Sequence, residues 1–364
     1  MSEPRFGIGA RHDGHARFAR WSTLVAMLAL VAGACASPAT SASPAASAAP
    51  APSAPAASEA APSESAASGA GVRIGYISGG DSDPFVLLVT NGIRAAATKA
   101  GVELSECDSD FAAEKALACA RTLESQQLAS MINWQFYPDS AAEICEAYGN
   151  LPTVAIDTPE RPCQKTFVGA NNREAGLISG KGLGDFAKSK FDCVYDAYIS
   201  LDFPVIAEIN AARAGGSKEG FEGVCGAVPK DKYFSVDTFQ GSPDQNENSR
   251  RQVTDILTTL PDAKTILVIA PNSDGSALAA LAAADVAGRK EQMWVVSHGA
   301  DPSVRDTIRN EPQWVGSVAY FPERYGDLVI PLAISLANGD TVPEQSLVTH
   351  IFIDKTNIDE FYPE

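Results

Sequence analysis

The residues best suited to chemistry stand together in the stretch Ser78–Phe85. Asp81 and Asp83 supply two carboxylates there, and Phe85 supplies an aromatic face. Such groups can bind a polar ligand or, as paired acids, transfer protons on a glycoside. A structural interpretation is equally open, in which Asp83 only caps a helix and Phe85 only packs.

A strand and a helix must position this stretch. Residues 72–78 form a short apolar run that stops at Gly79-Gly80, which predicts a buried strand and a tight turn. From Pro84 to Ala100 apolar residues keep a helical spacing, with Asp83 as N-cap and Gly101 as C-cap. Because ligands of parallel sheets bind beyond the carboxyl ends of the strands, next to helix N-termini, this loop would face such a site.

The alternation of strands and helices continues along the chain, at spacings of roughly 25–35 residues. We expect further strands over residues 102–107, 129–133, 152–157, 166–170, 193–200, 233–239, 264–269, 293–297, 314–320 and 347–353. We expect further helices over residues 108–128, 139–148, 172–188, 206–225, 248–259, 277–287, 303–309 and 325–337. So many strands exceed one comfortable sheet, so an α/β fold of two doubly wound lobes is predicted.

Length and charge narrow the function. A chain of 364 residues has room for about two domains. The net charge of −17 makes binding to nucleic acid or to an anionic membrane surface unfavourable. We therefore expect no nucleic-acid partner.

The N-terminus has the features of an export signal, and residues 1–34 are predicted to be a signal peptide. Arg5, Arg11, Arg17 and Arg20 form a basic region, and the apolar stretch Trp21–Ala34 follows. This stretch is shorter than the ~20 residues that a spanning helix needs. The small residues before Cys35 resemble a bacterial lipoprotein cleavage box, which implies lipidation of Cys35; ordinary secretion is the alternative.

Residues 35–71 are rich in Ala, Pro and Ser and have too few large apolar side chains to fold. We interpret this segment as a tether. With a lipid on Cys35, it would hold a globular body at the outer face of the bacterial cytoplasmic membrane, in the periplasm or at the cell surface.

The six remaining cysteines predict disulfide bonds, because their number is even in an exported chain. They are Cys107, Cys119, Cys145, Cys163, Cys193 and Cys225. Sequential pairing is the simplest of fifteen connectivities, and buried free thiols are the alternative. The spacing of Cys and His does not fit a zinc site, so no metal is expected.

The order of seven motifs points to a family. They are VRIGYISGGDSDPF, TVAIDT, FVGANNREAG, EGF, LPDAKTILVIAPNSDGSALAAL, MWVVSHGADPSV and VGSVAYFPERYG. Over residues 72–364 the sequence resembles the type I periplasmic sugar-binding proteins of the ribose/galactose class. The resemblance implies two Rossmann-like lobes with parallel sheets, joined by a three-segment hinge near Asn171, Phe321 and Leu347. The N-terminal lobe would contain residues 72–171 and 321–347, and the C-terminal lobe residues 172–320 and 348–364.

The resemblance also implies which side chains bind a ligand. Asp83-Pro84-Phe85 match the family's acidic residue, proline and aromatic residue before the first helix. A sugar stacks its apolar face on a ring and directs its hydroxyls to charged or amide groups, which suits Phe85 and Asp83. The full set of expected ligand-binding residues is Asp81, Asp83, Phe85, Trp134, Asp157, Thr158, Lys218, Asn272, Asp274, His298 and Tyr320.

The first half of the set contains one departure from the family and one open alternative. The family's Asp-Arg is Asp157-Thr158 here, so the aspartate is kept and the arginine is lost. Trp134 is either a stacking platform at the rim of the site or part of the core.

Further alternatives concern the second half of the set. The family's arginine before Gly-Phe corresponds to Lys218 or to Arg213, which is equally readable as a surface residue. An insertion leaves open whether Asn272 or Asp274 reaches the ligand. His298 or Asp301 would replace an aspartate that the family has and this sequence lacks, although a lone histidine is often structural. Tyr320 stands where the family usually has Gln or Asn.

These features predict a monomeric, non-enzymatic receptor that uses no cofactor and captures a small sugar, polyol or cyclitol. As the substrate-binding component of an ABC importer it would deliver the ligand to permease subunits. A sensory receptor that docks on a membrane kinase or chemoreceptor is the alternative, and a glycoside-active enzyme is a remote one. The nucleophile-elbow, zinc-protease and phosphate-loop patterns are not found in this sequence.

Overall fold

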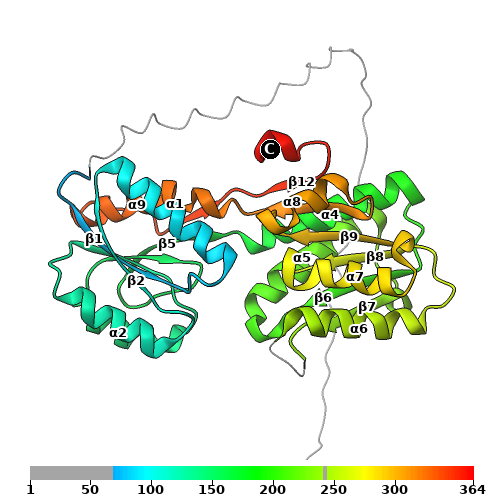
Figure 1. Ribbon diagram of the computed structural model, residues 1–364, viewed down its shortest axis with the longest axis horizontal. Helices are drawn as coiled ribbons and strands as arrows, with labels where there is room; N and C mark the ends of the chain where they lie inside the picture. The colour runs from blue at the N-terminus through cyan, green and yellow to red at the C-terminus, as the bar shows by residue number, and fades with distance from the viewer. Residues whose placement is uncertain (1–68, 241–243) are drawn as a thin grey trace, which may run out of the picture. The chain divides into compact units, whose positions relative to one another are not determined.

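The computed structural model describes residues 69–240 and 244–364 of the chain. The predicted signal peptide, Cys35 and the tether up to residue 68 lie outside the described residues. Within the described ranges, no helix has the length and apolar character needed to cross a membrane. Two α/β lobes, each built on a six-stranded sheet, make up this part of the chain (Figure 1).

The first lobe is built on the sheet β11-β5-β4-β3-β1-β2, whose neighbouring strands all pair in parallel. Its strands are β1 (Arg73–Ser78), β2 (Glu103–Asp108), β3 (Ser130–Asn133), β4 (Thr153–Ile156), β5 (Gln164–Ala170) and β11 (Gln345–Val348). Its helices are α1 (Pro84–Ala100), α2 (Ala113–Glu124), η1 (Pro138–Ser140), α3 (Ala141–Ala147), η6 (Pro322–Arg324) and α9 (Tyr325–Ala337). Because the strands are parallel, their carboxyl ends meet at one edge of the sheet.

Helices cover both faces of this first sheet (Figure 1). α1 and α9 pack on one face, where Ile93 and Ile330 share a core with β1 and β3. α2 and α3 pack on the other face, where Leu123 and Ile144 share a second core. Because helices cover both faces, the central strands β1, β3 and β4 are buried along almost their whole length.

The second lobe is built on the sheet β12-β10-β9-β8-β6-β7, in which β12 is antiparallel to β10 and the other pairs are parallel. Its strands are β6 (Ala197–Asp202), β7 (Tyr233–Asp237), β8 (Ile266–Ala270), β9 (Met293–His298), β10 (Trp314–Ala319) and β12 (Ile351–Ile353). Its helices are α4 (Asn172–Phe191), η2 (Pro204–Ile206), α5 (Ala207–Cys225), η3 (Lys230–Lys232), α6 (Gln245–Thr259), η4 (Ser273–Ala277), α7 (Leu278–Val286), η5 (Lys290–Gln292), α8 (Pro302–Asn310) and α10 (Ile358–Phe361). α6, α7, α8 and α10 contribute to one core of this lobe, and α4 and α5 contribute to the other.

Glycines allow α4 and α5 to approach each other closely. A Cβ atom on Gly180 would lie 1.8 Å from the carbonyl oxygen of Ser217, and one on Gly176 would lie 2.7 Å from that of Arg213. No larger residue fits at such distances unless the helices separate. The packing therefore fixes the backbone of α5 at Arg213 against α4.

Three segments connect the lobes within the described residues. The first follows β5 at Asn171, the second follows β10 at Tyr320, and the third contains His350 between β11 and β12. We expected a single strand over residues 347–353, and this was wrong. The structure has two short strands there, because β11 pairs with β5 in the first sheet and β12 pairs with β10 in the second.

The helix expected over residues 108–128 is also shorter than predicted. α2 begins only at Ala113, because Asp110 and Phe111 have φ angles of 45° and 56°. These left-handed backbone conformations do not fit a right-handed helix. By contrast, α1 begins and ends where its caps predicted, and Gly101 takes the left-handed C-cap conformation with φ 74°.

Three disulfide bonds join the cysteines of the described residues in sequential order. They are Cys107–Cys119, Cys145–Cys163 and Cys193–Cys225. The first two lie in the first lobe. The third ties the segment after α4 to the end of α5, which adds a covalent link to the glycine-mediated packing of that helix pair.

Candidate functional site

The N-terminus of α1 lies at the carboxyl edge of the first sheet. The Oδ1 atom of Asp83 accepts hydrogen bonds from the backbone N–H groups of Phe85, at 2.8 Å, and Val86, at 3.1 Å. Asp83 is therefore the N-cap that the sequence predicted. Its charge also contributes, after burial and the charge of Asp274, to the raised pKa of Asp301 in the second lobe.

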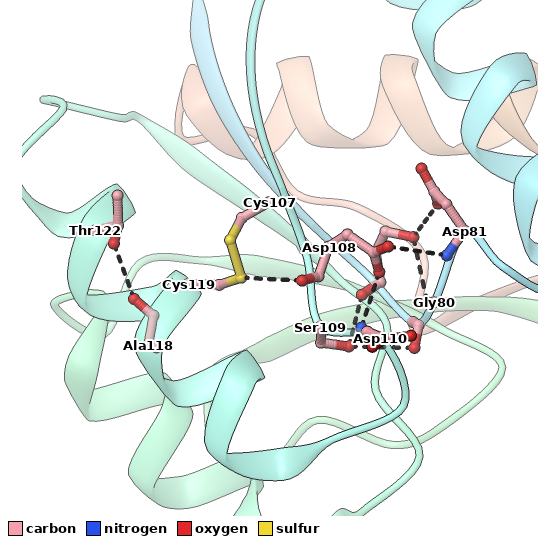
Figure 2. The surroundings of a disulfide bond; sticks show 11 residues. Gly80, Asp81, Cys107, Asp108, Ser109, Asp110, Ala118, Cys119 and Thr122 are labelled. Carbon is pink, nitrogen blue, oxygen red and sulfur yellow. Dashed lines mark hydrogen bonds between the residues drawn. A yellow bond between two sulfur atoms is a disulfide. The ribbon is translucent and has the colours of Figure 1, made fainter.

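Asp81 is engaged with its own lobe. Its Oδ1 atom accepts hydrogen bonds from Ser78 Oγ and Thr90 Oγ1, at 2.5 and 2.8 Å, and its Oδ2 atom pairs with Arg94 at 3.2 Å. Figure 2 shows its backbone N–H directed at Asp108, next to the disulfide between Cys107 and Cys119. These contacts hold the loop after β1 against β2.

Three aromatic rings gather around Phe85. Its ring centroid lies 6.3 Å from that of Trp134, 6.4 Å from that of Tyr320 and 6.2 Å from that of Tyr325, all edge to face. Trp134 is only 2% exposed and belongs to the core of the first lobe. Phe85 is partly exposed, so its ring is the face in this group that a ligand can reach from the first lobe.

Arg213 on α5 is the cation at the centre of the candidate site. Its Nε atom donates to Asn172 Oδ1 at 2.7 Å, and one Nη atom donates to the carbonyl oxygen of Pro271 at 3.1 Å. Its guanidinium carbon lies 4.7 Å from the ring centroid of Tyr320. Burial raises the pKa of Asp157 in the first lobe, and the charge of Arg213 opposes that rise.

Lys218, the other cation considered in the sequence, has different neighbours. Its ammonium group pairs with Glu222 on the same helix and lies 6.0 Å from the ring centroid of Tyr233. From the sequence, Arg213 could equally be a site residue or a surface residue, because its immediate neighbours do not distinguish the two. The available signal was the spacing of Gly216 and Gly220, which follow Arg213 on the face of α5 that packs on α4.

Asp157 follows β4 at the edge of the first sheet, in a left-handed conformation with φ 51°. Its Oδ1 atom accepts from the backbone N–H of Ala170 at 3.1 Å, and the hydroxyl of Tyr325 lies 3.4 Å away. Burial raises the pKa of Asp157 to about 6, although the Ala170 N–H and the charge of Arg213 oppose this rise. Thr158 is next in the chain and is partly exposed.

His298 is a buried residue that contacts the hydroxyl of Tyr320. It is 2% exposed, and its Nδ1 atom is 2.7 Å from the Tyr320 hydroxyl. Its Nε2 atom is 3.1 Å from Ser179 Oγ on α4. Burial, followed by the charge of Arg213, lowers the pKa of His298 well below its ordinary value, so the imidazole is neutral. His298 thus supports Tyr320, whose burial raises the pKa of its hydroxyl to about 12.

Asn272 and Asp274 stand at the edge of the second sheet after β8. The side-chain amide of Asn272 donates to Gln245 Oε1 and accepts from Ser276 Oγ, both at 2.7 Å. Asp274 is exposed. Its charge and that of Asp83 add to burial in raising the pKa of Asp301 to about 6. Charges of carboxylates from both lobes therefore act on Asp301.

The arrangement brings aromatic rings and carboxylates from the edges of the two sheets together with the guanidinium of Arg213 from α5. These are the groups that stack on a sugar ring and hydrogen-bond to its hydroxyls. Within residues 69–240 and 244–364, no group of three or more His, Cys, Asp or Glu side chains is placed to hold a metal ion.

Known proteins share both the sequence pattern and the fold. The profile of the periplasmic binding protein domain matches residues 74–341. No curated protein sequence matches this chain significantly.

Three solved structures illustrate the structural likeness. One is an ABC transporter solute-binding protein from Mycobacterium smegmatis with bound glycerol (21% identity, TM-score 0.64, covering 79% of this chain and 96% of that one). Another is an ABC transporter solute-binding protein from Actinobacillus succinogenes with bound D-allose (16% identity, TM-score 0.64, covering 79% of this chain and 99% of that one). A third is an ABC transporter solute-binding protein from Bacillus halodurans with bound myo-inositol (17% identity, TM-score 0.62, covering 80% of this chain and 98% of that one). At these identities the likeness establishes the fold, which is that of type I periplasmic binding proteins.

Proposed function

Because the chain belongs to the periplasmic binding protein domain family, we propose that it captures a small polyhydroxylated molecule between its two lobes. The family consists of solute-binding proteins and not of enzymes. The observation that carries the proposal is the meeting of Phe85 and Asp157 from the first lobe with Arg213 and Tyr320 from the second.

The chemistry of these groups suits a sugar, polyol or cyclitol. Phe85 offers a ring edge and face for apolar C–H groups, while Asp157 and Arg213 offer acceptors and donors for hydroxyls. Solved structures with this fold contain glycerol, D-allose and myo-inositol, which are all polyhydroxylated and uncharged. That range supports the class of ligand.

The lobes divide the binding work. Each lobe supplies part of the site, so a ligand that touches both parts stabilises the arrangement in which they face it together. Binding in the micromolar range corresponds to about −8 kcal/mol. This is within reach of a few charge-assisted hydrogen bonds and one stacked ring.

A thermal-shift panel of the purified protein tests the proposal. Glycerol, D-ribose, D-allose, D-galactose, allitol and myo-inositol serve as probes. A probe present at 100 times its dissociation constant stabilises the protein by about 2.7 kcal/mol, which raises the melting temperature measurably. A panel in which no probe moves the melting temperature would refute the proposed ligand class.

Delivery of the ligand to the permease of an ABC importer completes the proposed function. A lipid on Cys35 and the tether of residues 35–71 would keep the lobes close to that permease. Metabolic labelling with a radioactive fatty acid checks the anchor: label should enter the wild type and not the Cys35→Ala variant. Equal labelling of both would refute lipidation at this residue.

A further inference from the structure

His350 lies where the three segments that connect the lobes come together. It stands between β11 and β12, so it belongs to the third segment itself. Its Nε2 atom accepts a hydrogen bond from the backbone N–H of Asn171 in the first segment, at 3.0 Å. Its Nδ1 atom lies 3.3 Å from the carbonyl oxygen of Ala319, where the second segment leaves β10. One imidazole ring therefore links all three segments.

These two partners determine the protonation state of the ring. The backbone N–H of Asn171 can only donate, so Nε2 must be unprotonated to accept its hydrogen bond. The carbonyl oxygen of Ala319 can only accept, so Nδ1 carries the hydrogen. The neutral imidazole forms both hydrogen bonds. Protonation of Nε2 would place its N–H against the backbone N–H of Asn171, and the hydrogen bond between them would be lost.

The connected segments also carry residues of the candidate site. Tyr320 directly follows Ala319, and its ring packs against the imidazole of His350 at a centroid distance of 4.7 Å. Asn172 directly follows Asn171, and its side chain accepts the hydrogen bond from Arg213 Nε. His350 is only 5% exposed, so it supports Tyr320 directly, and Arg213 through Asn171 and Asn172, from the interior of the protein.

We propose that His350 is a positioning residue, whose neutral imidazole holds the three connecting segments together and keeps Tyr320 and Arg213 in place for the ligand. Protonation at Nε2 breaks the hydrogen bond from Asn171 and weakens ligand binding in acid. The link to ligand binding rests on the proposed function, whereas the link among the three segments does not.

Charged and titratable groups surround His350 from several elements. Burial is the main cause that lowers the pKa of His350, and the charge of Arg213 on α5 acts in the same direction. The hydrogen bond to Ala319 and the charge of Glu174 on α4 oppose this lowering. His298 on β9, the neighbouring imidazole, is neutral, and so is Tyr320 at any pH near 7.

The sign of the pH dependence follows from the lowered pKa. In the unfolded chain His350 would titrate near its ordinary value of about 6.5. Its contribution to stability is therefore complete above that pH, and is lost as the pH falls from 6.5 toward the lower pKa of the folded state. Ligand binding should weaken over the same direction of pH change.

An NMR titration of the purified protein tests the link among the segments without any ligand. We expect the His350 imidazole to titrate below pH 6.5 and the amide of Asn171 to shift with the same midpoint. In His350→Gln the side-chain oxygen can still accept from Asn171 but does not titrate, so the Asn171 amide should stay constant. The proposal is overturned if the chemical shift of the Asn171 amide does not change as His350 titrates, or if it changes equally in His350→Gln.

Calorimetric titration with D-allose and myo-inositol tests the effect on binding at two pH values, one unit above and one unit below the His350 midpoint that the NMR titration measures. The dissociation constant of the wild type should rise by up to about tenfold per pH unit below the pKa of His350. The difference between the wild type and His350→Gln isolates this residue from Asp157 and Asp301, whose carboxyl groups have pKa values of about 6. We expect His350→Gln to lose less affinity in acid, and His350→Ala to bind weakly at both pH values.

If the dissociation constants of the wild type and of His350→Gln rise equally in acid, the proposed coupling between His350 and ligand binding is refuted. If neither probe binds, the titration is repeated with the panel probe that raises the melting temperature. A panel without such a probe refutes the ligand class of the proposed function, and not the role of His350. The NMR titration still decides whether His350 joins the three segments.

Discussion

Glu160 is a carboxyl group buried in the first lobe, and its ionisation should reduce stability at alkaline pH. Only 1% of its surface is exposed. Its oxygens accept hydrogen bonds from Asn133 Nδ2 at 3.0 Å and from the backbone and side-chain nitrogens of Gln135 at 3.2 and 3.1 Å. Burial nevertheless prevails over these bonds and raises the pKa of Glu160 to about 8.

The size of the effect follows from the difference between the folded and unfolded pKa values. Between pH 6 and pH 9 the unfolded chain holds no proton on Glu160, whereas the folded protein gives its proton up around pH 8. The folded state therefore binds more protons, and the free energy of unfolding falls as the pH rises. Most of this loss falls between pH 6 and pH 8, where the folded protein still holds the proton. Two pH units at ~1.4 kcal/mol per unit amount to about 3 kcal/mol.

The variant Glu160→Gln removes this titration. Asn133 Oδ1 is buried without a hydrogen-bond partner in the described residues, so a rotated Asn133 amide can accept from the new glutamine. We expect Glu160→Gln to match the wild type at pH 6 and to be more stable by about 3 kcal/mol at pH 9.

Urea unfolding at pH 6, 7, 8 and 9 measures this difference. Glu143→Gln, which changes an exposed carboxylate on α3, is the matched control and should follow the wild type throughout. Unfolding free energies of the wild type and Glu160→Gln that stay parallel from pH 6 to pH 9 would refute the reasoning about burial.

Two further predictions concern packing and capping. Gly180→Ala should destabilise the protein by about 2–3 kcal/mol in urea unfolding, because the new Cβ atom would meet the carbonyl oxygen of Ser217. Gly223→Ala on α5 is the control: its Cβ atom would enter open space, so this variant should be more stable than the wild type by about 0.5–1 kcal/mol. Equal effects of the two variants would contradict the close contact of α4 and α5. Asp83→Ala should lower stability by about 1 kcal/mol through loss of the cap, and Asp83→Asn should keep the cap. If Asp83 also binds ligand hydroxyls, Asp83→Asn weakens binding in calorimetry at unchanged stability; unchanged affinity would leave it a cap alone.

Local signals predicted the parts of the fold that local chemistry decides. Asp83, Pro84 and Gly101 mark the ends of α1 because a cap and a left-handed terminus need particular residue types. The end of β2 was harder, since the left-handed conformations of Asp110 and Phe111 leave no mark in residue type. Residues 347–353 read as one apolar strand, and only pairing with two different sheets divides them.

The candidate site was predictable to the extent that it lies at strand ends. Asp157 and Tyr320 follow β4 and β10, and their positions at sheet edges come from the alternation of strands and helices. Arg213 comes from the middle of a helix, and it reaches the site only because α4 and α5 pack so closely. His350 acts through backbone atoms of two distant segments, which a linear sequence does not bring together.

Calorimetric titration of lobe-matched variants tests the central claim most directly. We predict that a probe from the sugar panel binds once per chain, and that Phe85→Ala in the first lobe and Arg213→Ala in the second each weaken its binding tenfold or more, about 1.4 kcal/mol or more. Melting temperatures of both variants serve as the check on folding. Binding that survives unchanged in either folded variant would contradict a site shared by the two lobes.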